Sequence, residues 1–323
     1  MPRTWLVSIV GVVLVLAGCS SPVPGTASVN DTELKRYQAA RGPLNVRDAL
    51  GDLTTVDYCS VLDLARAQQA GAAEVGPPKS MWNQCAAAAK VGGRDAALIV
   101  GLLVDGSEEP RVTDLSRKLD RGLMAQMPPG ATPHRCVRYL GFPDGPSLEV
   151  DVFDPAADTY DLAVLTRMCA VTSALFDGLT ADALAKKVAH FTFAPGSLGT
   201  TDACSVLSDA AVSAELGKPA RRQPISTGHR CVWKSGAMWV DLDFDVSGPI
   251  PPATDIIGGR PSVVAAKIPT DCGVTTTVAP SSPGSGGGVE IALLYMVDPS
   301  GIKDPCAVAT ALAGAAWPRL PRA

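Results

Sequence analysis

Acidic side chains at alternate positions are the first residues in this sequence that could do chemistry. Asp241, Asp243 and Asp245 alternate with apolar residues, and Glu149 and Asp151 follow the same pattern. Because successive side chains of a strand point to opposite faces, each set is expected on one face of its strand. Carboxylates can bind calcium, but neighbours about 7 Å apart along one strand share an ion only with help from another segment. We therefore interpret both sets as water-facing sides of half-buried strands and predict no metal site.

Histidine, the usual base of a hydrolytic site, is scarce in this chain. The first and last of the three histidines each lie two residues before a cysteine that is expected to be oxidised: His134, His190 and His229. A Ser-His-Asp or Cys-His site needs a histidine base, and the sequence contains no nucleophile elbow, zinc-protease helix, phosphate loop or dinucleotide fingerprint. We predict no catalytic residue and no cofactor, so the protein is not expected to be an enzyme. The less favoured alternative is an enzyme with an unfamiliar carboxylate site at residues 241–245.

Two tryptophans are the candidate ligand contacts. Trp233 and Trp239 have an even spacing, so they would share a face if one strand ran through both. Gly236 lies between them and favours a turn. Aromatic side chains of this kind pack into a core more often than they contact a ligand. The two tryptophans are therefore kept as possible ligand contacts beside the alternative that they are core residues.

Cysteine is the other residue type with possible chemistry. Nine are present, and setting Cys19 aside leaves two sets of four: Cys59, Cys85, Cys136 and Cys169, then Cys204, Cys231, Cys272 and Cys306. Structural zinc and disulfide exchange both favour closely spaced C-x-x-C pairs, and none occurs. An even number of cysteines in an exported chain predicts disulfides. Each set allows three pairings; we favour first with second and third with fourth, which ties each helix to a strand.

The residues around the cysteines indicate an internal repeat. Cys-Ser-Val-Leu occurs at 59–62 and 204–207, and Cys-Ala-Val occurs at 169–171 and 306–308. Similar flanks and similar steps between the cysteines predict a tandem duplication. One match has another register, because His-Arg-Cys-Val occurs at 134–137 and 229–232. This leaves open whether each domain consists of two similar halves or the first has an insertion around Cys85.

Helices and strands must position these residues. The pattern predicts helices over 60–70, 161–176, 208–216 and 304–315, and strands over 97–104, 148–153, 238–246, 274–278 and 289–297. We expect an α+β fold of two tandem homologous domains, residues 51–195 and 196–323. Each is an antiparallel sheet with flanking N- and C-terminal helices and two disulfides. Residues 110–127 are expected to add a helix to the first domain.

The N-terminal residues have the order of a lipoprotein signal peptide. Arg3 is followed by an apolar run from Trp5 to Leu16, and Ala17-Gly18 precedes Cys19. The apolar run is too short to span a membrane and matches a signal peptide, residues 1–18. We expect cleavage before Cys19 and attachment of acyl chains such as palmitate to it. Residues 19–50 are then a lipidated tether on the extracytoplasmic face of the cell membrane.

Composition and net charge limit the kinds of partner that this chain is expected to bind. Hydrophobic residues make up 46% of the chain and charged residues 19%, which is enough apolar material for real cores. The formal net charge is −4 and no run of basic residues occurs, so no nucleic-acid partner is expected. The membrane, through Cys19, is the predicted partner, together with an envelope protein or lipid.

Three of these motifs together resemble a known family. Cys-Ser-Val-Leu opening a helix, Cys-Val-Trp at 231–233 opening a strand and a fourth cysteine in a closing helix resemble a domain of unknown function in lipoproteins of mycobacteria and related actinobacteria. The stretch Ser21–Ala27 resembles the tethers of those lipoproteins. Membership would imply a cell-envelope lipoprotein, but the family has no agreed activity. From the absence of catalytic motifs and the predicted membrane anchor, we expect a non-enzymatic protein that binds an envelope protein, a lipid or a cell-wall component. The alternative is an accessory structural subunit of a secretion or transport complex.

Overall fold

The computed structural model describes residues 42–104, 116–127, 134–156, 161–225, 227–248, 250–266, 268–280 and 288–322. The predicted signal peptide and the lipidation site Cys19 lie outside the described residues. Gly42–Ala323 form one compact unit. Residues 44–50 therefore differ from the expected tether, because Leu44, Val46 and Leu50 are buried in the first core.

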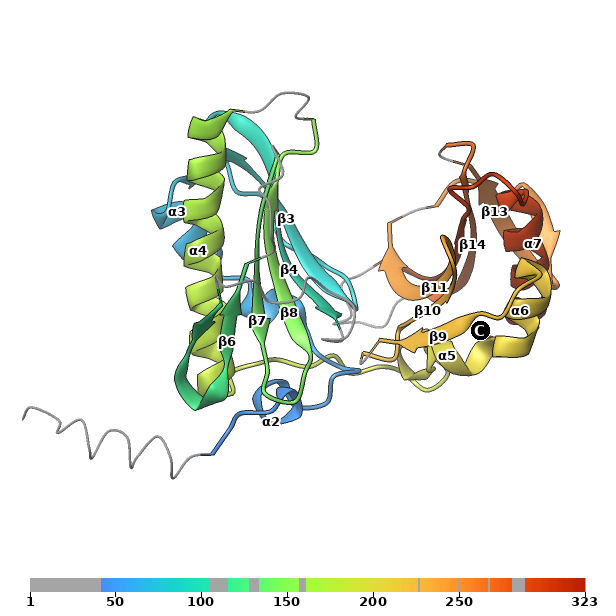
Figure 1. The fold of residues 1–323 in the computed structure, drawn as a ribbon, viewed down its shortest axis with the longest axis horizontal. Helices are drawn as coiled ribbons and strands as arrows, with labels where there is room; N and C mark the ends of the chain where they lie inside the picture. The colour runs from blue at the N-terminus through green and yellow to red at the C-terminus, as the bar shows by residue number, and fades with distance from the viewer. Residues whose placement is uncertain are drawn as a thin grey trace, which may run out of the picture. The chain divides into compact units, whose positions relative to one another are not determined.

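The first sheet is antiparallel and has the strand order β1-β3-β4-β8-β7-β6-β5, with β2 paired to β3 (Figure 1). Its helical elements are α2 (Val46–Leu50), η1 (Tyr58–Val61), α3 (Leu64–Gln69), η2 (Asp120–Gly122) and α4 (Leu162–Ala185). Its strands are β1 (Ala72–Ala73), β2 (Lys79–Ser80), β3 (Gln84–Val91), β4 (Arg94–Val104), β5 (Arg117–Lys118), β6 (Met124–Gln126), β7 (Arg135–Gly141) and β8 (Ser147–Phe153).

Helix α4 covers one face of the first sheet (Figure 1). It begins where the Asp161 side chain accepts hydrogen bonds from the backbone N–H groups of Ala163 and Val164, and it ends at the left-handed residue Lys186. Val171, Leu175 and Leu179 are fully buried against the sheet. Among the described helices, α4 alone is long and apolar enough to cross a membrane. Its packing on the sheet is that of a core helix.

The second sheet is also antiparallel, in the order β12-β13-β14-β15-β11-β10-β9. The helical elements are η3 (Leu198–Thr200), α5 (Ala203–Val206), α6 (Asp209–Leu216), α7 (Pro305–Ala316) and η4 (Trp317–Arg319). The strands are β9 (Arg221–Pro224), β10 (Arg230–Ser235), β11 (Met238–Ser247), β12 (Asp255–Ile257), β13 (Arg260–Ala265), β14 (Asp271–Pro280) and β15 (Val289–Val297). The fold is therefore α+β with two antiparallel sheets.

Four disulfides join helical turns to strands. The bonds are Cys59–Cys85, Cys136–Cys169, Cys204–Cys231 and Cys272–Cys306. The favoured pairing of first with second and third with fourth cysteine in each set is confirmed. Each bond closes a loop of the chain and removes conformational freedom from the unfolded state.

The four sheet cysteines occupy one position in four similar hairpins. Each faces a residue of the neighbouring strand: Cys85 faces Val100, Cys136 faces Val152, Cys231 faces Leu242 and Cys272 faces Met296. In every hairpin the N–H two residues beyond that partner donates to the carbonyl two residues before the cysteine. These bonds are Leu102 to Asn83, Asp154 to His134, Phe244 to His229 and Asp298 to Thr270, at 2.7–2.9 Å. The shared His-Arg-Cys-Val sequence thus marks equivalent places in two of the four hairpins.

One predicted element is wrong in the part that the structure describes. Residues 116–127 form β5, η2 and β6 rather than a helix. Met124, Ala125 and Gln126 pair with the edge of β7, and Gly122 has a positive φ of 75° that ends the short turn before them. Pairing at the sheet edge therefore determines the conformation of this segment.

Candidate functional site

The outer face of β11 carries the aspartates that the sequence singled out. Val240, Leu242 and Phe244 are fully buried in the second core, so Asp241, Asp243 and Asp245 project from the opposite side of the strand. Asp241 receives the guanidinium of Arg230, with Nε–Oδ2 and Nη2–Oδ2 distances of 2.9 and 2.5 Å. Two aspartates of the row are therefore left for other contacts.

Those contacts come from the turn between β2 and β3. A bulge in β4 at Gly101 and Leu102 shapes this turn, because the Leu102 N–H donates to the carbonyl of Asn83 at 2.7 Å. Gly101 has a φ of 142°, and a Cβ there would lie 2.3 Å from the Cα of Gln84. Only glycine fits so close an approach, so the bulge holds Trp82 and Asn83 at the end of the hairpin.

Trp82 belongs to the core of the second sheet although it precedes a strand of the first. Its side chain is 1% exposed. The indole lies edge-on to Phe193, with ring centroids 5.2 Å apart, and 5.1 Å from the ring of His229. Phe193 also contacts His229. Burying a tryptophan in this way is a large apolar contribution to the contact between the two sheet domains.

The polar half of this contact uses the aspartates. The backbone N–H of Trp82 donates to Oδ1 of Asp245 at 2.8 Å. The Asn83 side chain donates to Oδ1 of Asp243 at 2.7 Å and accepts from the hydroxyl of buried Thr227 at 2.8 Å. The face of β11 that was predicted to be water-facing is therefore partly covered at Asp243 and Asp245, whose side chains are half-buried. We call this contact, made by Trp82 and Asn83 with Asp243, Asp245, Thr227 and His229, the interdomain joint.

Burial sets the electrostatics of the interdomain joint. It raises the pKa of Asp243 well above its usual range, and the neighbouring charges of Asp245 and Asp241 raise it further. Burial likewise raises the pKa of Asp245 to about 6, against the hydrogen bonds from the Trp82 and Val246 N–H groups. It lowers the pKa of His229, whose Nε2 lies 3.1 Å from the carbonyl of Gly199. The joint thus disfavours charge on all three groups.

The first sheet has a related cluster on β8. Arg135 contacts Glu149 at 2.6 Å and Asp151 at 2.9 Å, and this pairing of Arg135 with Asp151 is the equivalent of Arg230 with Asp241. Glu149 and Asp151 are 6% and 3% exposed, so the prediction of a water-facing strand is wrong here. Burial raises the pKa of Asp151 to about 6, although the Arg135 charge opposes it.

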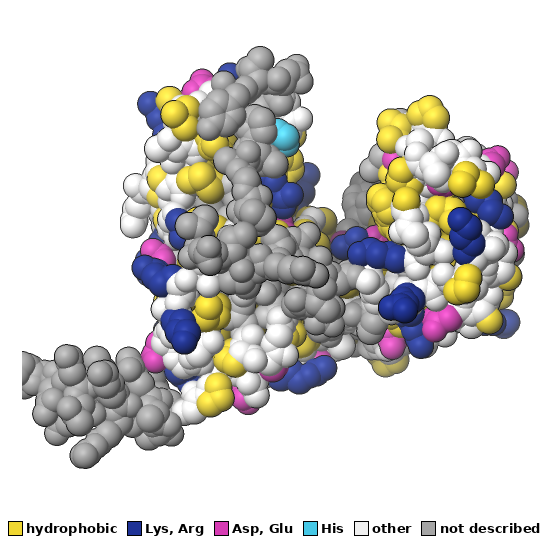
Figure 2. Space-filling model, in the orientation of Figure 1, with side chains coloured by type: hydrophobic (Ala, Val, Ile, Leu, Met, Phe, Trp, Pro, Cys, Tyr) yellow, Lys and Arg dark blue, Asp and Glu magenta, His cyan; other side chains and the backbone are white. Residues whose placement is uncertain are grey.

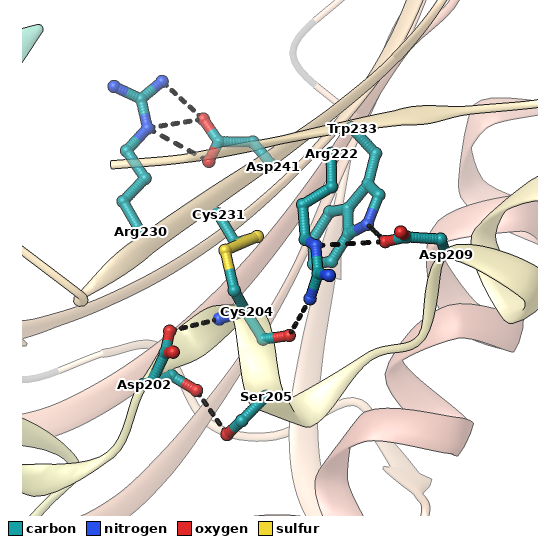
Figure 3. Close-up of a disulfide and its surroundings, with 9 residues drawn as sticks. All are labelled: Asp202, Cys204, Ser205, Asp209, Arg222, Arg230, Cys231, Trp233 and Asp241. Carbon is teal, nitrogen blue, oxygen red and sulfur yellow. Dashed lines mark hydrogen bonds and ion pairs between the residues drawn. A yellow bond between two sulfur atoms is a disulfide. The ribbon is translucent and has the colours of Figure 1, made fainter. Parts of the chain in front are cut away.

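The structure separates the two candidate tryptophans. Trp233 pairs with Val240 across the hairpin, whereas Trp239 pairs with Lys234, so the two side chains lie on opposite faces. Trp233 is fully buried, and its Nε1–H donates to Asp209 at 3.0 Å. Figure 3 shows this bond near the Cys204–Cys231 disulfide, with Arg222 reaching both Asp209 and the carbonyl of Cys204. Only Trp239, half-buried on the outer face, remains available to a ligand.

The two other histidines lie at the surface of the described residues. His134 is exposed, and His190 is exposed beside the hydroxyl of Thr55, at 2.9 Å. The described residues contain no group of three or more potential metal ligands. A cavity of about 410 Å³ lies against the β12–β13 turn and Trp317. Arg260 lines it, but its guanidinium holds the carbonyls of Trp317, Leu320 and Pro321.

Comparisons with protein families, curated proteins and solved structures found no match to this chain. No related protein therefore adds evidence on function to the geometry of the interdomain joint. Sequence reasoning missed Trp82 and Asn83. The one available signal was that Trp82 precedes Cys85, whereas Trp233 follows Cys231.

Proposed function

We propose that this chain is an exported, lipid-anchored envelope protein that acts as a two-domain, non-enzymatic binding module. The observation that carries the proposal is the set of four disulfides in the folded part, each between a helical turn and a strand. Such bonds persist in an oxidising compartment outside the cytoplasm. The signal-peptide pattern ending at Cys19 supports the anchor on the extracytoplasmic face of the cell membrane.

The outer face of the second sheet is the binding surface that we favour. Helices α6 and α7 pack against the opposite face (Figure 1). Trp239, Tyr295 and Leu293 project outward as half-buried side chains on β11 and β15. Leu293 and Tyr295 extend over Gly273, because a Cβ there would lie 3.4 Å from a carbon of each side chain. Aromatic side chains beside polar ones are typical of protein and ligand contact surfaces. The ligand is an envelope protein, a lipid or a cell-wall component.

The charge pattern agrees with a partner that is not a polyanion. On the face shown in Figure 2, the lysines and arginines of the described parts lie among acidic and apolar side chains rather than in one basic area. The formal net charge of the chain is −4. Nucleic-acid binding depends on neutralising many phosphates at once, so this pattern does not favour it.

Duplication accounts for the arrangement of the two sheet domains. Each has two cysteine hairpins joined at the centre of the sheet, β4 beside β8 in the first and β11 beside β15 in the second. The equivalent hydrogen bonds in all four hairpins support a unit of one hairpin and one disulfide-linked helical turn. In this proposal the two domains are tandem homologues, as in the actinobacterial lipoproteins that the chain resembles, and each domain is itself two similar halves.

An affinity-capture experiment tests the binding role. The lipidated protein is purified from detergent-solubilised membranes as the wild type, as Trp239→Ser and as the control Ile256→Ser, whose parent side chain is 71% exposed on β12. A stoichiometric protein, lipid or glycan retained by the wild type and the control but lost with Trp239→Ser is the expected result. Recovery of no such component, or equal recovery with all three proteins, contradicts the proposal.

Two other functions have less support. An enzyme with a carboxylate site is favoured only by the raised pKa values of Asp243 and Asp245, which are typical of catalytic acids. Those carboxylates come from one strand and already accept hydrogen bonds from Trp82 and Asn83. An accessory structural subunit of a secretion or transport complex would also use the outer sheet face. Co-purification of several subunits, rather than one ligand, would distinguish it.

A further inference from the structure

The cavity beside the β12–β13 turn has a positively charged lining. Its volume is about 410 Å³, and six residues line it: Gly258, Gly259, Arg260, Trp317, Pro318 and Arg322. Two of the six side chains carry a positive charge, and none carries a negative one. A cavity of this volume is large enough for a small molecule, and the charge of its lining indicates which kind of ligand it can bind.

The guanidinium of Arg260 is held in place by the turn that follows α7. Its Nε donates to the carbonyl of Trp317 at 3.0 Å, and its Nη2 donates to the carbonyls of Leu320 and Pro321 at 3.1 and 2.6 Å. These bonds leave Nη1 without a hydrogen-bond partner among the described residues. Carbonyl groups have no net charge, so the guanidinium keeps its positive charge while its plane is fixed. A guanidinium fixed in this way loses little conformational freedom when it binds an anion.

Arg322 brings a second guanidinium to the same cavity. Its side chain is exposed and forms no hydrogen bond or ion pair with the described residues. The two arginines lie close enough to repel, because burial lowers the pKa of Arg260 and the charge of Arg322 lowers it further. No described carboxylate forms an ion pair with either arginine. The described part of the chain therefore does not balance the two positive charges of this cavity.

The turn between β12 and β13 adds backbone donors to the cavity. Gly258 and Gly259 form a two-residue loop with positive φ values of 55° and 80°. The N–H groups of such a loop lie outside the ladder of strand hydrogen bonds and can donate to a ligand. A Cβ at Gly258 would lie 2.9 Å from the Cδ of Pro318, whereas a Cβ at Gly259 would have no atom within 4 Å. Glycine at position 258 thus allows the turn to lie against Pro318.

We propose that this cavity binds a phosphate group, either as free phosphate or as the monoester of a small organic molecule. A phosphate monoester carries a charge of about −1.5 to −2 at neutral pH, which two guanidinium groups balance more closely than they balance a single carboxylate. Nη1 of Arg260 and the guanidinium of Arg322 donate to the phosphate oxygens in this arrangement. The site goes beyond the proposed binding function, because it lies beside the end of α7, which packs on the face of the sheet opposite Trp239.

The size of the cavity leaves room for more than the phosphate. A free phosphate ion fills only part of a volume of about 410 Å³. Pro318, an exposed residue of the lining, offers an apolar surface to an organic group carried by the phosphate. The two sources of the phosphate are therefore distinguished by comparing the ion with an aromatic monoester.

Calorimetric titration of the full chain, in a buffer of low salt concentration without phosphate, tests the site. The probes are inorganic phosphate, phenyl phosphate and, as the uncharged analogue, phenol. We expect saturable binding of the phosphate probes with a Kd below about 10 mM and no comparable binding of phenol. Tighter binding of phenyl phosphate than of inorganic phosphate supports a monoester, and equal binding supports free phosphate. The proposal is overturned if neither phosphate probe binds saturably, or if phenol binds as tightly as phenyl phosphate.

Variants of Arg322 make the result specific. Arg322→Gln removes one charge from a side chain that bonds to no described residue, so the fold should be retained. Affinity for phosphate should fall about tenfold or more, as expected when one charge-assisted hydrogen bond is lost. Arg322→Lys should restore most of that affinity, because it restores the charge. The matched control is Arg221→Gln, an exposed arginine of β9, which should bind as the wild type does.

Nuclear magnetic resonance locates the bound phosphate. The backbone amide signals of Gly258 and Gly259 should shift on titration with inorganic phosphate, whereas that of Gly236, in the turn between β10 and β11, should not. Equal weakening by Arg322→Gln and Arg221→Gln, or phosphate-induced shifts that leave Gly258 and Gly259 unchanged, would overturn the assignment of the site to this cavity.

Discussion

Removing the Trp82 side chain should destabilise the second domain and leave the first nearly unchanged. Trp82 precedes β3 of the first sheet, but it is 1% exposed within the core of the second. Truncating a buried tryptophan to alanine costs about 3–5 kcal/mol. The indole N–H has no partner in the described structure, and removing it recovers about 1 kcal/mol of that cost. The expected net loss is about 2–4 kcal/mol.

Native-state hydrogen exchange resolves this loss by region. Peptides covering β10 and β11 should lose about 2–4 kcal/mol of protection in Trp82→Ala. Peptides from α4 should lose less than about 1 kcal/mol, because that helix packs on the first sheet alone.

Two controls make the comparison specific. Trp82→Phe should lose less than Trp82→Ala, since a phenyl ring refills part of the space beside Phe193. Trp239→Ala removes the same side chain from the half-buried outer face and should cost less than about 1.5 kcal/mol. An equal loss in α4 and β11, or a loss below about 1 kcal/mol in β11, would refute the assignment of Trp82 to the second core.

Three further outcomes are expected. Replacing Cys136 and Cys169 together by serine opens a disulfide loop with a sequence separation of 33, which should lower the free energy of unfolding of the first domain by about 3–4 kcal/mol in urea titrations. Gly101→Ala should shift the urea midpoint of the first domain downward, since its Cβ would lie 2.3 Å from the Cα of Gln84; an unchanged midpoint would contradict the need for glycine there. Cys19→Ser should abolish incorporation of labelled palmitate and release the protein from membranes, and retention on membranes would exclude Cys19 as the anchor.

Local sequence patterns predicted several elements closely. The strand expected at 289–297 is β15, and the helix expected over 208–216 is α6, which stops at Gly217 with a positive φ of 69°. The helix expected over 60–70 is divided, because Leu62 leaves the helical conformation and Asp63 caps a new helix, α3. Alternation and capping act within a few residues, so one sequence shows them.

Local sequence patterns did not predict pairing at the sheet edge or contacts between residues far apart in the chain. Residues 124–126 have no strong pattern of their own and become β6 because β7 offers an unpaired edge. Trp233 and Trp239 lie on opposite faces because the turn between β10 and β11 reverses the chain between them. In both cases the partner segment determines the outcome, and its position depends on the whole sheet.

The carboxylates of β11 separate what the sequence determined from what only the tertiary structure determined. Alternation in the sequence determined that Asp241, Asp243 and Asp245 share one face, because a strand has a period of two. The cysteine count and flanks likewise indicated four disulfides in two sets. Only the folded chain brings Trp82 and Asn83, 163 and 160 residues away, onto Asp245 and Asp243. That distant turn desolvates the two carboxylates and raises their pKa values, since desolvation depends on what covers a residue rather than on its neighbours in sequence.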